Sequence, residues 1–286
     1  MRRYLGLLLL GTFALTVCGA LVAQRPFKEW PAIEYSDFPL PPDWKQKAEW
    51  TRARLRYPDI YGYPDVPLMY NDGRPFPGYW TMDYPRSDRH LLEGVRRLTR
   101  IESSSVEQVV SFGDDDMYNY PTLYAVEVGH WKLHEEDAKQ LREFLLRGGF
   151  LMVDDFHGSN ARDHDQGINE WQIFTASMSR VFPDRDIVDI PNNDPIFHTI
   201  FDLSDRFQVP GAQYFESGLI YEKGQTGKEP HWRGIYDDHG RIMVAICHNM
   251  DLGDAWEHSD EARYQEKWAS LAYRIAMNYF VYDLTH

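Results

Sequence analysis

The chain has 286 residues, of which 43% are hydrophobic and 26% charged, a balance typical of a folded protein rather than a disordered one. Its formal net charge of −14 argues against a nucleic-acid partner, because phosphate backbones are bound by clustered lysine and arginine. Two cysteines are too few for a disulfide framework. Aromatic residues make up 15% of the chain, so we expect them either to line a binding groove or to fill an irregular core.

The N-terminus carries an export signature. Arg2 and Arg3 precede a stretch without charge from Tyr4 to Ala23. A basic region followed by an apolar run is typical of a signal peptide, and this run is also long enough to span a bilayer. We therefore predict that residues 1–23 are a signal peptide or an N-terminal membrane anchor. The rest of the chain is then periplasmic or extracellular, and membrane contact is expected only through this segment.

Residues 24–51 are rich in proline and aromatic residues, which predicts an extended arm, because proline resists both helix and strand. One α/β domain is expected over residues 52–286, with its first strand at 52–57. Residues 58–85 contain several glycines and prolines and predict a long irregular loop without regular elements. Such loops in compact domains are often functional.

The middle of the chain alternates between helical and strand patterns. Ser87 is a suitable N-cap for a helix whose apolar stripe is Leu91, Leu92, Val95 and Leu98. We then expect, in order, strands at 106–112 and 123–128, a helix at 135–147 and a strand at 150–153. The short links between residues 123 and 153 predict a strand–helix–strand unit with parallel strands.

In the last third we expect a helix at 170–182 and a short strand at 186–190, followed by an irregular stretch at 191–232. A hairpin at 233–246 and a long helix at 261–284 complete the chain. Asp237 to Gly240 form the turn of the hairpin. Alternating strands and helices predict a three-layer α/β sandwich with a mainly parallel central sheet, of the flavodoxin-like kind, plus this C-terminal hairpin and long helix.

Two apolar runs, at residues 150–153 and 242–246, are each followed at once by dense polar residues. In an α/β sheet ligands bind beside the carboxyl ends of the strands, so we expect both polar segments to share one site. The candidate pocket residues are Asp154, Asp155, His157, His248, Asn249, Asp251, Asp254, Trp256 and Glu257.

These side chains allow two interpretations. Imidazole and carboxylate together suit a divalent metal such as Zn, with Asp155, His157, His248 and Asp251 as candidate ligands, and a water on that metal could serve hydrolysis. Alternatively the acids cap helices and bond loop backbone, with Asp251 or Asp254 capping a short helix through Trp256.

Two further hypotheses concern Cys247 and the tryptophans. Ala245-Ile246-Cys247-His248 resembles the strand-to-helix elbow that holds a nucleophilic cysteine. Hairpin pairing of this strand argues against the elbow, and a buried structural thiol is commoner. A sugar-binding module is the other possibility, since aromatic rings near polar residues can stack on sugar rings. The rings concerned are Trp80, Tyr84, Trp171, Trp232 and Trp256.

A series of short motifs resembles one protein family over roughly residues 52–286. The motifs are Asp83-Tyr84-Pro85, Tyr120-Pro121, Gly148-Gly149-Phe150-Leu151, Asp154-Asp155-Phe156-His157-Gly158, Val181-Phe182-Pro183, Pro195-Ile196-Phe197-His198 and the stretch from His248 to Glu257. The family is DUF4159, a domain of unknown function, which at fold level is similar to the class I glutamine amidotransferase-like superfamily that includes ThuA-like proteins. The resemblance implies this fold and export but no established activity.

We therefore expect an exported domain of the cell envelope that binds a carbohydrate or an envelope component, or that serves assembly, through the acidic and histidine pocket. Its partner is then a small molecule, a glycan or an envelope protein. The alternatives are a metal-dependent hydrolase that uses the Asp and His cluster and, less favoured, a cysteine-dependent amidotransferase-like enzyme.

Overall fold

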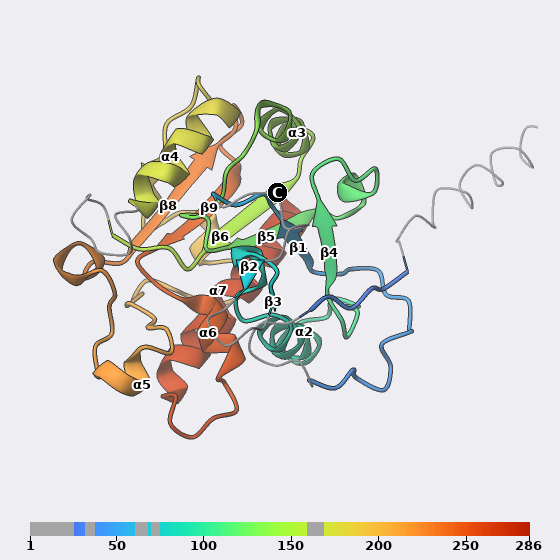
Figure 1. Ribbon diagram of the computed structural model, residues 1–286, viewed down its shortest axis with the longest axis vertical. Helices are drawn as coiled ribbons and strands as arrows, with labels where there is room; N and C mark the ends of the chain where they lie inside the picture. The colour runs from blue at the N-terminus through green and yellow to red at the C-terminus, as the bar shows by residue number, and fades with distance from the viewer. Residues whose placement is uncertain (1–25, 32–37, 61–67, 70–74, 159–168) are drawn as a thin grey trace, which may run out of the picture.

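The computed structural model describes residues 26–31, 38–60, 68–69, 75–158 and 169–286. Within these residues seven strands form one sheet, and helices pack on both of its faces (Figure 1). The expected three-layer α/β sandwich is confirmed. The expected signal or anchor segment and the polar residues 159–168 lie outside the described residues. No helix in the described part of the chain is long and apolar enough to cross a membrane.

The sheet has the order β4-β1-β5-β6-β9-β8-β7. Its parallel part consists of β4 (Gln108–Ser111), β1 (Ala53–Arg56), β5 (Thr122–Val126), β6 (Phe150–Asp154) and β9 (Ile242–His248). Antiparallel pairing adds β8 (His231–Tyr236) and β7 (Val188–Asp189). The strands β5, β6 and β9 are buried along their whole length, as expected for strands that are covered on both faces.

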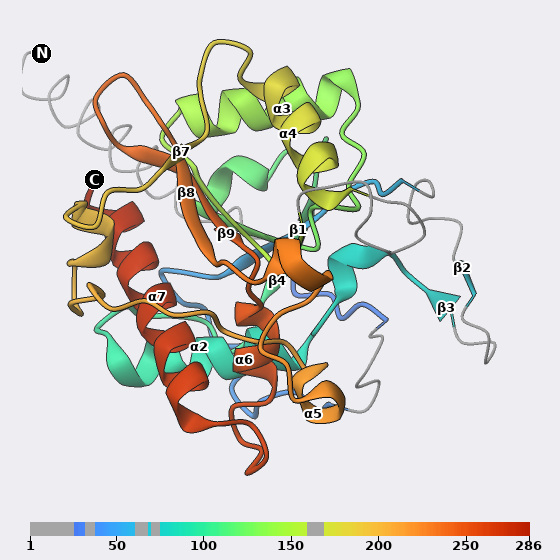
Figure 2. The ribbon, with the colours of Figure 1, turned by 90° about the vertical axis from the view of Figure 1, so that its left-hand side faces the viewer.

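Each face of the sheet is covered by its own group of helices, as Figure 2 shows from the side. One face carries α3 (Glu135–Leu146) and α4 (Glu170–Val181), which contact each other. The other face carries α2 (Arg86–Leu98), α6 (Leu252–Glu257) and α7 (Glu266–Thr285). The short helix α5 (Tyr214–Ser217) lies in the long connection before β8. The core is accordingly divided into two apolar layers, one on each side of the sheet.

Several local expectations were wrong. Ser87 is a buried residue inside α2, whose N-cap is Pro85, and Leu98 is 49% exposed rather than part of the buried stripe. The loop expected to lack regular elements contains β2 (Leu68–Met69), β3 (Pro75–Phe76) and a 3₁₀ turn, Tyr79–Thr81. Further 3₁₀ turns are Met117–Asn119, Pro195–Phe197 and Gly224–Gly227. The last helix begins five residues later than expected, because residues 258–264 form turns.

The described part of the N-terminal arm packs on the domain. Trp30 meets Trp80 edge-on, with ring centroids 5.7 Å apart. Arg89 of α2 donates to the Phe38 carbonyl oxygen at 2.8 Å, and Arg96 donates to Asp43 at 2.6 Å. The arm is therefore attached to the α2 side of the domain along these residues.

A buried ion pair connects α2 to the sheet. The Asp88 carboxylate lies 3.2 Å from Arg52 Nε and 2.7 Å from Arg54 Nη2, and all three side chains are fully buried. Arg54 also donates to the Trp80 and Met82 carbonyl oxygens at 3.0 Å, so the same guanidinium holds the segment that leads into α2. Removing the acid would leave two guanidinium groups in the core without their counter-ion.

We expect Asp88→Ala to lower the free energy of unfolding by about 3–5 kcal/mol, the usual cost of breaking a buried ion pair on one side. Urea unfolding followed by circular dichroism measures the change. The control is Glu93→Ala, which removes the exposed partner of Arg97 on the same helix and should cost less than about 1 kcal/mol. Equal losses in the free energy of unfolding for the two variants would show that the buried ion pair stabilises the fold no more than the exposed one.

Candidate functional site

Strained backbone marks the edge of the sheet where β5, β6 and β9 end. The residue after each strand is Glu127, Asp155 or Asn249, with φ of 52°, 52° and 61°. The left-handed region costs a residue other than glycine on the order of 1 kcal/mol, and such residues concentrate at functional sites. Among the described residues only Asp83 and Lys223 share this conformation, and both contact groups at the same edge.

Three carboxylates converge at this edge. Asp83 precedes α2, Asp155 follows β6 and Asp251 is the N-cap of α6, and one oxygen of each lies within 4.8 Å of the others. All three side chains are buried. A Cβ atom added to Gly253 would overlap the Asp83 carboxylate, so the missing side chain of this glycine lets α6 approach.

Burial sets the electrostatics of this group. It raises the pKa of Asp155 well above the usual value, and Glu127 adds to the effect. Burial also raises the pKa of Asp251, with further contributions from Asp155 and Asp254. Carboxylates this close repel one another when ionised, so each one disfavours ionisation of its neighbours and a bound cation would relieve the repulsion.

Asp154 has a structural part in the same region. Its Oδ2 accepts hydrogen bonds from the backbone N–H groups of Leu252 and Gly253 at 2.8 and 2.9 Å and from the Tyr124 hydroxyl at 3.3 Å. Burial raises the pKa of Asp154 to about 7 although these donors favour its charge. The carboxylate therefore joins the end of β6 to the start of α6.

Asp251 caps α6, as the second interpretation of the polar segment expects. Its Oδ1 accepts a hydrogen bond from the Asp254 N–H at 2.7 Å. The same residue contributes to the group of three carboxylates. Capping and participation in a site are therefore compatible in one side chain.

His157 lies beside this group. Its Nε2 is 3.1 Å from Asp155 Oδ1 and 3.8 Å from Glu222 Oε1, and its backbone N–H donates to Glu170 at 2.6 Å. Burial opposes the charge of the ring, but Glu222 and Asp155 outweigh it and raise the pKa of His157 to about 10. His157 is thus an imidazolium that compensates part of the acidic charge.

His248 lies apart from the three aspartates, in a cluster of rings. Its Nε2 donates to the Gly158 carbonyl oxygen at 2.9 Å, and its ring centroid lies 4.9 Å from Phe156 and 4.6 Å from Trp171. Burial lowers the pKa of His248 to about 3, so the ring is neutral. This contact with Gly158 brings the two predicted polar segments together.

Asn249 connects the loops around the site. Its Oδ1 accepts from the Gly158 N–H at 2.8 Å, and its Nδ2 donates to the Thr226 and Glu229 carbonyl oxygens at 2.9 and 2.8 Å. These bonds use the whole amide. The side chain therefore organises backbone at the edge of the sheet.

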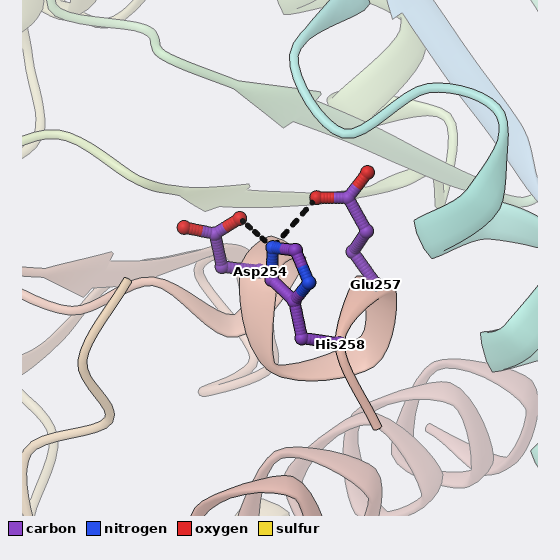
Figure 3. Close-up of side chains that lie close together, drawn as sticks. All are labelled: Asp254, Glu257 and His258. Atoms are coloured by element: carbon purple, nitrogen blue, oxygen red, sulfur yellow. Dashed lines mark ion pairs between the residues drawn. The ribbon is translucent and has the colours of Figure 1, made fainter. Parts of the chain in front are cut away.

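Asp254, Glu257 and His258 form a second group on and just after α6 (Figure 3). His258 Nε2 lies 3.5 Å from Asp254 and 3.2 Å from Glu257, while Nδ1 lies 2.6 Å from Glu261. Burial opposes its charge, but these carboxylates raise the pKa of His258 to about 10. Both ring nitrogens face carboxylates, which is the environment of an imidazolium rather than of a metal ligand.

Cys247 and most of the aromatic candidates lie in the core. The thiol is fully buried in the layer that includes α7, and burial raises its pKa well above the usual value, which disfavours a nucleophilic thiolate. The strand β9 pairs with β8 in the expected hairpin, yet it also runs parallel to β6. Four of the candidate rings are buried, namely Trp80, Tyr84, Trp232 and Trp256. Only Trp171 is half-buried.

Several residues of the site were not anticipated from the sequence. Glu127 follows β5 just as Asp155 follows β6, so the argument from strand ends, applied to β5, would have found it. Asp83 belongs to one of the motifs that resemble the family. The sequence of its loop, however, did not indicate that Asp83 would lie next to Asp155 and Asp251. Glu170 and Glu222, which contact His157, are brought there by the tertiary fold alone.

The raised pKa of His258 predicts how stability changes with pH. The stabilisation is complete below the unfolded pKa of about 6.5 and is lost as the pH rises through the folded value of about 10. His258→Gln should therefore lower the melting temperature most at pH 6, and the difference from the wild type should shrink towards pH 10. Each kcal/mol corresponds to about 2–4 °C in a domain of this size.

Thermal unfolding across this pH range measures the effect, with His239→Gln in the exposed hairpin turn as control. The control should follow the wild type at every pH. A gap between His258→Gln and the wild type that stays constant with pH would show that His258 is not charged in the folded state.

The comparison with protein families agrees with the motifs. The sequence model of the family described as "Domain of unknown function (DUF4159)" matches residues 67–284, which include the three converging aspartates and all the polar strand ends described above. No curated protein matches the chain at a significant level. Because the match covers most of its length, the chain belongs to the DUF4159 family.

Proposed function

We propose that this protein is an exported domain of the cell envelope that binds a divalent cation through Asp83, Asp155 and Asp251. The observation that carries the proposal is that one oxygen of each buried carboxylate lies within 4.8 Å of the others. Two ligands of one ion can be separated by at most twice the metal–oxygen bond, which is about 4–5 Å for Mg²⁺ and Ca²⁺. The three oxygens therefore fit one ion.

The donor set favours a hard cation. All three ligands are carboxylate oxygens, which suit Mg²⁺, Ca²⁺ or Mn²⁺ better than Zn²⁺. The two histidines that would favour Zn²⁺ already have other partners, since His157 pairs with the ligand Asp155 as an imidazolium and His248 donates to Gly158. This donor set differs from the mixed Asp and His set expected from the sequence, and it favours cation binding over sugar stacking, because most of the candidate rings are buried.

Export rests on the N-terminal sequence. Arg2 and Arg3 followed by the uncharged residues 4–23 support passage across the membrane and a periplasmic or extracellular location. The ion would then come from outside the cytoplasm. A glycan, a small molecule or an envelope protein remains the class of partner that we propose for the domain.

The cation site can be tested with variants that keep the local backbone. Asn tolerates the left-handed region as well as Asp does, and it caps helices equally well, so Asp155→Asn and Asp251→Asn remove charge without removing these roles. We expect the full chain, stripped with EDTA, to gain thermal stability on addition of Ca²⁺, Mg²⁺ or Mn²⁺. At an ion concentration of 100 times Kd the gain is about 2.7 kcal/mol.

Both variants should lose this gain, whereas Asp205→Asn, which changes an exposed acid, should keep it. Circular dichroism checks that each variant is folded. Variants that fold and still respond to the ions like the wild type would contradict the proposal.

Metal-assisted hydrolysis is the second candidate, and the position of His157 favours it. Its Nε2 contacts a proposed ligand, Asp155, at 3.1 Å, and its Nδ1 is buried without a hydrogen-bond partner among the described residues. As an imidazolium, His157 is placed to donate a proton as a general acid during hydrolysis, while a water on the ion would supply the nucleophile.

A panel of p-nitrophenyl esters and phosphates in the presence of the stabilising ion tests this candidate. His157→Gln should lower an ion-dependent rate by about 10²–10⁴-fold and leave the ion-induced stabilisation in place. A rate that is unchanged in this variant would exclude His157 as the general acid.

A further inference from the structure

A groove lies beneath the N-terminal arm, at the edge of the sheet opposite the aspartates. Its volume is about 550 Å³, and part of its lining is formed by Thr51, Val106 and Tyr120, which precede the parallel strands β1, β4 and β5. The aspartates lie instead where the parallel strands end. The groove and the candidate site are thus on opposite edges of one sheet.

Apolar and aromatic side chains form part of the walls of the groove, together with polar ones, and two lysines lie at its rim. Phe27 and Trp44 of the arm, whose ring centroids lie 5.6 Å apart, form one wall, and Val106 and Tyr120 belong to the rest of the lining. Lys45 and Lys47 also line the groove, and both are exposed. An apolar groove with cationic groups at its opening suits a ligand that has an apolar tail and an anionic head.

The charges in the described part of the arm favour an anionic ligand although the whole chain is acidic. Two arm acids are paired with arginines of α2, Glu29 with Arg89 and Asp43 with Arg96. Within the described part of the arm this leaves the exposed Lys28, Lys45 and Lys47 against one exposed acid, Glu49. The exposed charges that remain in residues 26–31 and 38–51 are therefore mainly positive, on a chain with a net charge of −14.

One acid faces the groove from within. Glu107 is almost fully buried and lies 3.4 Å from Arg89 Nε. Burial raises the pKa of Glu107, which limits its negative charge. The lysines at the rim, rather than this acid, thus determine the charge that a ligand meets on entry.

The position of the groove in the chain indicates where such a ligand is found. Pro26 and Phe27, which line it, follow closely after the uncharged residues 4–23. Aromatic residues and lysines directly beyond an apolar segment are typical of the membrane–water interface. We propose that the groove binds an anionic phospholipid of the membrane surface, so that the domain rests on the membrane by this edge and the aspartates face away from it.

This proposal goes beyond the cation site and does not depend on it. The test uses the full chain reconstituted into vesicles of phosphatidylcholine, alone or mixed with phosphatidylglycerol, each with a photoactivatable acyl chain on a trace of the same lipid. Mass spectrometry then locates the cross-linked peptides. We expect cross-links in residues 26–47 and 104–120, enriched with phosphatidylglycerol and weakened by salt.

The double variant Lys45→Gln and Lys47→Gln should reduce this cross-linking by up to about 25-fold, since each of the two lysines near an anionic surface contributes roughly fivefold in affinity. The matched control replaces Lys139 and Lys228, two exposed lysines elsewhere, and should cross-link like the wild type. Cross-links that are equal in both lipids and unaffected by the double variant would overturn the proposal.

The same samples separate this proposal from the cation site. The double lysine variant should keep the ion-induced rise in melting temperature, and Asp155→Asn should keep the cross-links. Loss of one property without the other identifies which of the two proposals has failed.

Discussion

Asp154 is the side chain on which the arrangement of the site depends. A carboxylate without solvent needs hydrogen-bond donors, and leaving it unpaired costs several kcal/mol. The N–H groups of Leu252 and Gly253 supply them. Separating the end of β6 from the start of α6 would break these hydrogen bonds and leave the buried carboxylate without them. Asp155 directly follows Asp154 and Asp251 directly precedes Leu252. One buried contact therefore holds two of the three converging aspartates in place.

The two acidic groups differ in how their charge is balanced, and this difference decides which of them suits an ion. The group on α6 contains its own cation, since His258 faces carboxylates through both ring nitrogens. In the group of three aspartates, His157 pairs with Asp155, and the charge of Arg54 also acts on Asp83. We therefore expect a bound external cation to stabilise the group of three aspartates more than the group on α6.

The sequence predicted those parts of the fold that follow from local pattern. Uninterrupted apolar runs indicated that β6 and β9 are buried strands, and the polar residues after them located the edge that holds Asp155 and Asp251. The parallel pairing of β9 with β6 was not predicted, because the turn before β9 indicated only a hairpin. Asp83 was not found, because its position depends on how α2 packs on the sheet. The neutral state of His248 also could not be foreseen, since it results from the surrounding rings and from the Gly158 carbonyl, which only the folded chain supplies.

The way the sheet ends next to β8 has a consequence for solubility. A long, flat edge strand offers unpaired backbone groups to another copy of the chain, and this is a common route to aggregation. Here the last strand, β7, has only two residues, both exposed, and one of them is the charged Asp189. An edge strand this short offers few backbone groups for the addition of a strand from another molecule. It would therefore reduce aggregation through this edge at high protein concentration.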